Sequence, residues 1–150
     1  MYVITFANPK GGSGKTTSAM LLAEQIAISG GRVAILDLDP NANILAWAQA
    51  REAEGREVPF AVHARPQAEE TVELIDNLSG EADYLIIDLE GSKDQIVTFA
   101  LSRTDLCVIP LDGSPMEARQ AATAVRLVQT TSNMIRTPID YTLLFTRTNA

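Results

Sequence analysis

The sequence predicts an α/β protein with a doubly wound, mainly parallel sheet and helices on both faces. Short apolar, β-branched runs alternate with longer segments of helical periodicity, as in consecutive βαβ units. No Asn-Gly hairpin signal separates the strand-like runs, which favours parallel pairing. The chain has 150 residues, of which 46% are hydrophobic, enough for one core. We therefore expect residues 1–150 to form a single domain.

The first three elements are expected in the order strand, helix, strand. The run "YVITFA" at 2–7 is short and apolar, as a buried strand requires. Residues 16–29 are apolar at helical spacing, and the pair Gly30-Gly31 ends that helix. The run "RVAILDLD" at 32–39 is the second strand.

The remaining elements continue the alternation. Asn41 is placed to cap a helix at about 42–53, and "GREVP" ends that helix before the third strand. The other expected strands are 60–64, 83–88, 105–110 and 141–146, and the other expected helices are 67–78, 96–102 and 115–130.

Charge and cysteine content exclude some classes of protein. The net charge of −7 has the wrong sign for a domain that binds nucleic acid through bulk electrostatics, so a DNA contact would have to be local or made by an assembly. A lone cysteine, Cys107, cannot form an intramolecular disulfide, and nothing ahead of the first strand resembles a signal peptide. The apolar runs are too short to span a bilayer. We expect a cytoplasmic protein with no membrane partner.

The stretch "NPKGGSGKTT" at 8–17 has the layout of a phosphate-binding loop. Small residues let successive backbone N–H groups point at phosphate oxygens, and the N-terminus of the following helix adds positive potential. Lys15 would neutralise the β and γ phosphates, and Thr16 would place its hydroxyl on Mg²⁺. The alternative is a flexible glycine loop with solvated lysines. The expected nucleotide contacts are Lys10, Gly11, Gly12, Ser13, Gly14, Lys15, Thr16 and Thr17.

The loop departs from the general pattern in a specific way. Pro9 stands where the pattern has glycine, and Lys10 follows it. The stretch "KGGSGKT" resembles the deviant phosphate loop of the ParA/MinD family of P-loop ATPases, whose signature is the extra lysine. The resemblance extends over almost the whole chain and is nearest to small ParA-type plasmid partition ATPases. It implies that Lys10 acts on the nucleotide of a partner subunit.

The second strand ends in "ILDLDPNAN", where two aspartates are separated by one residue. By the resemblance, Asp39 belongs to a switch segment and orients the attacking water, and Asp37 has an outer-sphere role at Mg²⁺. Taken alone, the same residues also fit an ordinary strand-to-helix turn.

The run "YLIIDLEG" places Asp88 at the end of an apolar strand, where a carboxylate can hold a magnesium-bound water. This arrangement matches a Walker B strand. Glu90 is interpreted as a solvated loop carboxylate rather than as a general base.

Two later segments resemble the family's base-binding region. The run "VIPLDGSPMEA" suggests that Pro110 lies beside the nucleotide base, and "LLFTRTNA" suggests that Thr146 and Arg147 lie near adenine. An ordinary surface loop is the alternative for both segments.

The resemblance implies a magnesium-dependent ATPase switch that uses ATP and ADP and acts in the partition or positioning of plasmid or chromosomal DNA. Hydrolysis is expected to be slow and stimulated by a partner. The implied partners are a second copy of the chain in the ATP state, a ParB-like adaptor, and nonspecific DNA bound by the dimer. The expected catalytic residues are Lys10, Lys15 and Asp39, and the expected metal-site residues are Thr16, Asp37 and Asp88.

Three other functions remain open at this stage, of which one is a non-catalytic scaffold gated by nucleotide. A small-molecule ligase resembling dethiobiotin synthetase has the same fold and a phosphate loop, and a MinD-like positioning ATPase has a similar core. Lys10 and the pair Asp37 and Asp39 favour the switch over the ligase. Because the family continues with further elements, we also expect that the chain is a C-terminally shortened form.

Overall fold

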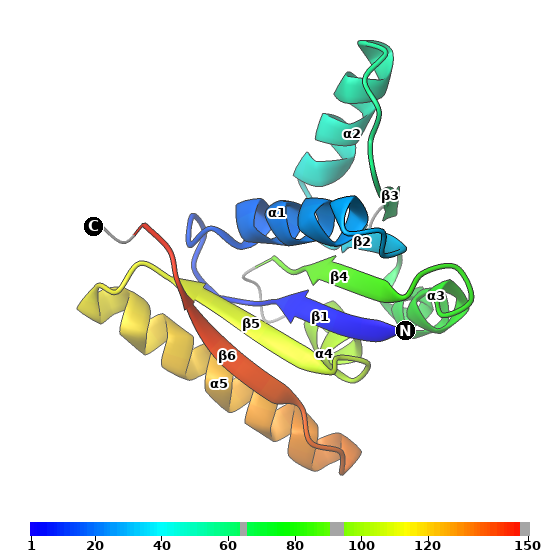
Figure 1. Cartoon of the computed structure of the whole chain (residues 1–150). Helices are drawn as coiled ribbons and strands as arrows, with labels where there is room; N and C mark the ends of the chain where they lie inside the picture. The colour runs from blue at the N-terminus through cyan, green and yellow to red at the C-terminus, as the bar shows by residue number, and fades with distance from the viewer. Residues whose placement is uncertain (64–65, 91–94, 148–150) are drawn as a thin grey trace.

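A computed structural model describes residues 1–63, 66–90 and 95–147 (Figure 1). Six parallel strands form one sheet with the order β3-β2-β4-β1-β5-β6. The strands are β1 (Tyr2–Phe6), β2 (Val33–Asp37), β3 (Ala61–His63), β4 (Tyr84–Asp88), β5 (Leu106–Leu111) and β6 (Asp140–Phe145). The helices are α1 (Lys15–Ile28), α2 (Asn43–Ala53), α3 (Thr71–Leu78), α4 (Gln95–Leu101) and α5 (Pro115–Ile135), with a 3₁₀ turn at Ala68–Glu70 before α3.

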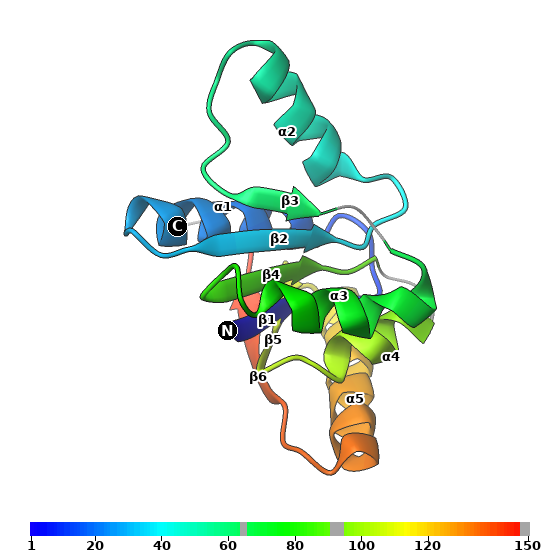
Figure 2. The same cartoon turned by 90° about the vertical axis from the view of Figure 1, so that its right-hand side faces the viewer.

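The sheet separates two hydrophobic cores, so the predicted doubly wound architecture is confirmed. Ile86 of β4 points into the core under α1 and α2, whereas its neighbours Leu85 and Ile87 point into the core under α3, α4 and α5. This alternation follows from the two-residue period of a strand. Figure 2 shows α1 on one side of the sheet and α3, α4 and α5 on the other. Within the described ranges, no helix is both long enough and apolar enough to cross a membrane.

The order of the strands determines where a ligand can bind. The chain runs from β1 outward to β2 and β3, returns to β4 beside β1, and then continues to β5 and β6 on the other side. A reversal of this kind opens a crevice at the carboxyl ends of the central strands. Phe6 and Asp37 are both in register with Asp88. Residues that follow β1, β2 and β4 therefore meet at the carboxyl end of the sheet.

The predicted cap of α2 is wrong. Asn41 donates its side-chain amide to Asp39 rather than accepting from the helix. The first helical N–H groups are bound instead by Asp37, whose Oδ2 accepts from the backbone nitrogens of Ile44 (3.0 Å) and Leu45 (3.4 Å). A left-handed backbone at Ala42 (φ 46°) turns the chain so that the helix begins directly over the end of β2.

Helix α5 is longer than the expected 115–130. It runs to Ile135, and Thr131, just beyond the expected end, is buried and continues the series of buried residues Ala121, Ala124 and Val128. Arg136, with a left-handed φ of 57°, ends the helix. Tertiary packing therefore outweighs the weak helix propensity of this segment.

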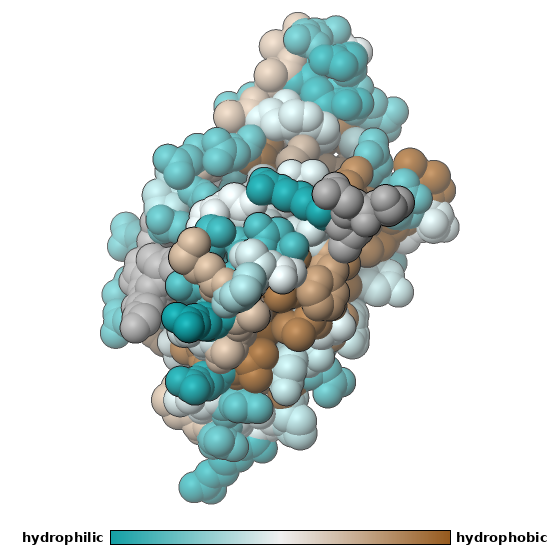
Figure 3. Space-filling model, turned by 90° about the vertical axis from the view of Figure 1, so that its left-hand side faces the viewer, coloured by the Kyte–Doolittle hydropathy of each residue, from teal (hydrophilic) through white to brown (hydrophobic). Residues whose placement is uncertain are grey.

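Strand β6 forms an exposed edge of the sheet. All six of its residues are exposed, including Leu143 (45%) and Phe145 (57%). Figure 3 views the molecule from the side where β6 ends in Figure 1 and shows apolar atoms among hydrophilic ones there. This edge contrasts with the buried central strands, which position the site.

Candidate nucleotide site

The loop between β1 and α1 has the backbone that a phosphate cradle requires. Gly12 (φ 80°) and Gly14 (φ 92°) adopt left-handed conformations that other residues rarely take. A side chain added at Gly11 or Gly12 would meet nothing within 4 Å, so the loop faces open space there. Gly14 caps α1 without a side-chain hydrogen bond, which leaves the helix N-terminus available to an anion.

A cavity of about 560 Å³ lies over this loop, in the range typical of small-molecule sites. It brings together the predicted residues Lys15, Thr16 and Asp39, which follow two different strands, β1 and β2, at the carboxyl end of the sheet. Asn41, Asn43 and Glu90 also line it and were not predicted as ligand contacts. The full lining is Pro9, Gly11, Gly12, Gly14, Lys15, Thr16, Thr17, Asp39, Asn41, Asn43, Glu90 and Arg147.

Lys15 is held inside the loop. Its Nζ donates to the backbone oxygen of Lys10 at 3.0 Å, and the residue is buried. Burial lowers the pKa of Lys15, and the carboxylate of Asp88 acts in the opposite direction. A phosphate that replaced the Lys10 carbonyl as acceptor would bring a negative charge into direct contact with the Lys15 amine.

Asp88 and Thr16 form the candidate metal site. The Thr16 hydroxyl donates to Asp88 Oδ2 at 2.6 Å. Asp88 is only 1% exposed, and its Oδ1 has no hydrogen-bond partner among the described residues. Burial raises the pKa of Asp88 to about 6, while the Thr16 hydrogen bond opposes that rise. A buried carboxylate with an unused oxygen beside a hydroxyl fits Mg²⁺, which prefers hard oxygen ligands and retains several waters.

The two aspartates that follow the second strand have different surroundings. Asp37 is fully buried, caps α2 through Oδ2, and accepts from the Asp39 backbone nitrogen through Oδ1 at 3.2 Å. Burial raises the pKa of Asp37 and the backbone hydrogen bonds oppose that rise. Asp39 faces the cavity, and its Oδ1 accepts from the backbone nitrogen of Asn41 at 2.8 Å. Asp39 is therefore the aspartate that can reach a ligand directly.

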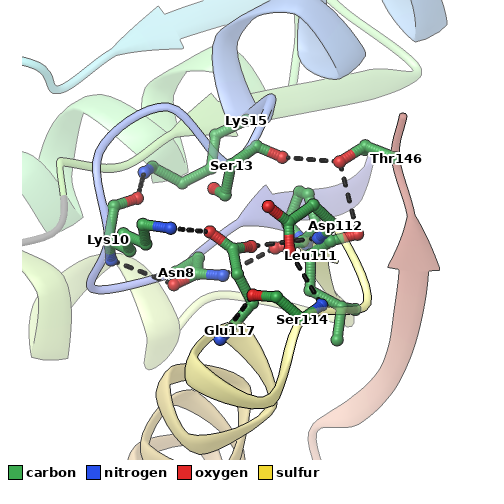
Figure 4. A network of polar contacts seen from close by, with 10 residues as sticks. Asn8, Lys10, Ser13, Lys15, Leu111, Asp112, Ser114, Glu117 and Thr146 are labelled. Atoms are coloured by element: carbon green, nitrogen blue, oxygen red, sulfur yellow. Dashed lines mark hydrogen bonds and ion pairs between the residues drawn. The ribbon is translucent and has the colours of Figure 1, made fainter. Parts of the chain in front are cut away.

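Lys10 does not line the cavity. Its Nζ lies 2.7 Å from Oε1 of Glu117, in the first turn of α5 (Figure 4). This hydrogen bond raises the pKa of Lys10. The side chain of Lys10 is directed at α5 rather than into the cavity, and its expected action on a nucleotide stays a prediction. Glu117 was not identified from the sequence, although the spacing "SPME" at 114–117 places a glutamate three residues after a helix-capping serine.

The residues expected near the base lie in three different environments. Pro110 is buried within β5, its carbonyl accepts from Asn8 Nδ2 at 2.6 Å, and it does not line the cavity. The hydroxyl of Thr146 donates to the Ser13 carbonyl at 3.0 Å, which ties β6 to the phosphate loop. Arg147 lines the cavity. A base contact for each of these residues stays a prediction.

Comparison with known proteins agrees with this geometry. The sequence profile described as ATPase MipZ matches residues 2–118, which include the glycine loop, Asp37, Asp39 and Asp88. The chain belongs to the MipZ family of ATPases. The predicted ParA/MinD resemblance is confirmed by this match and by Protein ParA of Rhizobium radiobacter, which is 32% identical over 148 residues. The alignment covers 97% of this chain and 64% of that protein, so this MipZ-family chain spans less than two thirds of its relative's length.

Solved structures confirm the fold. A plasmid partition protein from Borrelia burgdorferi B31 bound to AMPPNP superposes with a TM-score of 0.77 at 19% identity, covering 99% of this chain and 75% of that chain. Cobyrinic acid a,c-diamide synthase from Mycobacterium smegmatis, with a bound ATP analogue and magnesium, superposes with a TM-score of 0.76 at 20% identity, covering 95% of this chain and 72% of that one. Both similarities concern the fold, which is shared by proteins with different activities.

Proposed function

We propose that the chain is a ParA-like, magnesium-dependent ATPase switch for the partition or positioning of DNA, built as one domain over residues 1–150. The observation that carries the proposal is that the two lysines of the loop lie in different places. Lys15 lines the cavity, whereas Lys10 lies outside it and is directed at α5. A single-subunit phosphate site requires only the first lysine. The second lysine is paired with Glu117 of its own chain in the monomer, and we assign it to the nucleotide of another subunit in the dimer.

In this proposal, different residues bind the phosphates, hold the metal and orient the attacking water. The N–H groups of the glycine loop and Lys15 bind the phosphates of ATP or ADP. Thr16 and Asp88 would hold Mg²⁺, with Asp37 behind them, and the metal would supply positive charge to the β and γ phosphates. Asp39, which faces the cavity, orients the attacking water. Lys10 of a second subunit adds a cation as charge develops in the transition state.

The proposed partners follow from the family and from charge. The ATP state forms a homodimer that binds nonspecific DNA, and a ParB-like adaptor stimulates slow hydrolysis. Similarity to Protein ParA supports this assignment. Because the net charge is −7, basic residues from two subunits would have to form the DNA surface together.

The alternative within the same fold is a ligase that acts on a small molecule, since a diamide synthase superposes on the chain. The position of Lys10 favours the switch, because that lysine does not line the chain's own cavity. A MinD-like positioning ATPase uses the same switch chemistry and differs in its target surface.

Size-exclusion chromatography with light scattering tests the proposal. The wild-type chain should be a monomer with ADP and a dimer with a slowly hydrolysed ATP analogue and Mg²⁺. Lys10→Ala should bind ADP normally but form no dimer. Arg32→Ala is the matched control, because it removes a cation from an exposed ion pair with Asp83. This pair lies at the amino ends of β2 and β4, at the end of the sheet away from the glycine loop. A wild-type chain that stays monomeric with the analogue would refute the switch.

A further inference from the structure

The backbone of Asp39 is fixed at two points. Its nitrogen donates to Asp37 Oδ1 at 3.2 Å, and its carbonyl oxygen accepts from the backbone nitrogen of Ala42 at 2.9 Å. The second contact closes a turn whose first two residues are Asp-Pro, an order that favours a β-turn because proline fixes φ at the second position. The backbone alone does not determine where the carboxylate points, and that is the part of Asp39 that Asn41 binds.

Asn41 engages one oxygen of this carboxylate twice. Its backbone nitrogen and its side-chain Nδ2 each donate to Asp39 Oδ1 at 2.8 Å. Neither contact uses Oδ2, so the two oxygens of Asp39 have different surroundings. Rotation about χ2, a broad torsion that is roughly two-fold, would otherwise exchange them. The contacts with Asn41 therefore select the oxygen that stays against the loop.

Both residues line the cavity over the glycine loop, where only Asp39 was predicted to act. Burial lowers the pKa of Lys15, and the carboxylates of Asp88 and Asp39 oppose that fall, so the Asp39 carboxylate lies near the lysine assigned to the phosphates. The side chain of Asn41 is exposed, and a hydrogen bond between exposed groups contributes little to the free energy of unfolding. Its effect should therefore be on the position of Asp39 rather than on stability.

We propose that Asn41 is a positioning residue that restrains the Asp39 carboxylate so that Oδ2 is presented to the attacking water. The inference rests on the proposed function, in which Asp39 orients that water. A carboxylate that accepts a hydrogen bond from water aids hydrolysis only while its oxygen stays in place, because small displacements of a reacting group are costly. Asn41 should therefore affect the rate of hydrolysis and not the binding of ATP.

The variant Asn41→Ala removes the side-chain donor and keeps the backbone donor. With excess protein, Mg²⁺ and radiolabelled ATP, the single-turnover rate of hydrolysis should fall roughly tenfold. The affinities for ADP and for a slowly hydrolysed ATP analogue should not change. Asn41→Asp has the same shape but turns a second carboxylate toward Asp39, so it should be slowed at least as much. Asn77→Ala is the matched control and should hydrolyse ATP at the wild-type rate, because Asn77 is an exposed asparagine of α3, on the other face of the sheet from α1.

A double-mutant cycle tests whether Asn41 acts through Asp39. In the Asp39→Ala background there is no carboxylate to position, so Asn41→Ala should cause no further loss of rate. Binding of ADP with aluminium fluoride, a mimic of the transition state, gives a measurement that does not depend on turnover. Asn41→Ala should weaken that binding by about the same factor as the rate, because a group that orients water acts on the transition state. Unchanged binding of the mimic would overturn the inference.

The outcomes separate the inference from the proposed function. If Asp39→Ala is slow but Asn41→Ala is as fast as the wild type, the positioning role is refuted and the ATPase switch stands. An equal loss of rate with and without Asp39, or a matching loss of affinity for the ATP analogue, would also refute it, because Asn41 would then act without Asp39. If the wild-type chain does not hydrolyse ATP, the proposed function fails and the inference fails with it. A slow Asn41→Ala with no further loss in the Asp39→Ala background supports the inference.

Discussion

Replacing Asp88 with asparagine should stabilise the nucleotide-free protein while removing the carboxylate of the candidate magnesium site. Burial raises the pKa of Asp88 from its usual 3.8 to about 6, so at neutral pH the folded chain holds a carboxylate whose ionisation costs more than it does in the unfolded chain. At about 1.4 kcal/mol per pH unit, this rise in pKa lowers the free energy of unfolding by about 3 kcal/mol at pH 8. The asparagine side chain in Asp88→Asn would keep the shape and still accept from Thr16, but it would carry no charge.

The sign of the pH dependence makes this prediction specific. A carboxyl group with a raised pKa in the folded state destabilises that state increasingly as pH rises from 3.8 to about 6, and by a constant amount above it. The gain from Asp88→Asn should be about 3 kcal/mol at pH 8 and roughly half of that at pH 5. Urea denaturation of both proteins, with EDTA and without nucleotide, measures the difference in their free energies of unfolding at both pH values. Equal stability of the two proteins at pH 8, or a larger gain at pH 5, would refute the reasoning.

Three further predictions concern the same cavity. Lys15→Ala should weaken Mg-ATP binding roughly ten- to a hundredfold through loss of a charge-assisted phosphate contact, and calorimetry that found unchanged affinity would exclude Lys15 as a ligand. Asp39→Ala should bind ATP and dimerise but hydrolyse it more slowly, which a phosphate-release assay with adaptor and DNA measures; turnover at the wild-type rate would rule out its role on water. Asp37→Ala should increase hydrogen exchange at the amides of Ile44 and Leu45 about fivefold, from about 1 kcal/mol of lost capping, and unchanged exchange would show that the cap is dispensable.

The phosphate loop could be predicted because its information is local. A strand, a run of small residues, Lys15, Thr16 and a helix follow one another within the first 28 residues, and the backbone torsions at Gly12 and Gly14 agree with that layout. The position of Asp88 at the end of a strand could be predicted because the end of a buried strand is recognisable from its apolar run. The register that places it opposite Phe6 then follows from parallel pairing.

The contacts that the sequence did not reveal depend on long-range packing. Glu117 reaches Lys10 from 107 positions along the chain, a pairing that requires α5 to start beside the phosphate loop. The cap of α2 was assigned to Asn41 because asparagine is a common capping residue, but the position of the helix over β2 gives that role to Asp37. Helix α5 continues to Ile135 because Thr131 packs inside, which its sequence propensity does not predict.

The central position of β1 has a consequence for the order of events during protein synthesis. The strand that bears the phosphate loop is synthesised before the other five strands of the sheet, yet its two neighbours, β4 and β5, begin only at Tyr84 and Leu106. Asp88, which accepts a hydrogen bond from the Thr16 hydroxyl, is synthesised 72 residues after it. A chain still growing on the ribosome therefore has its glycine loop long before it has a nucleotide site, and closing that long separation is entropically expensive. In the proposed function, ATP would therefore stabilise only chains that have been synthesised through the centre of the sheet.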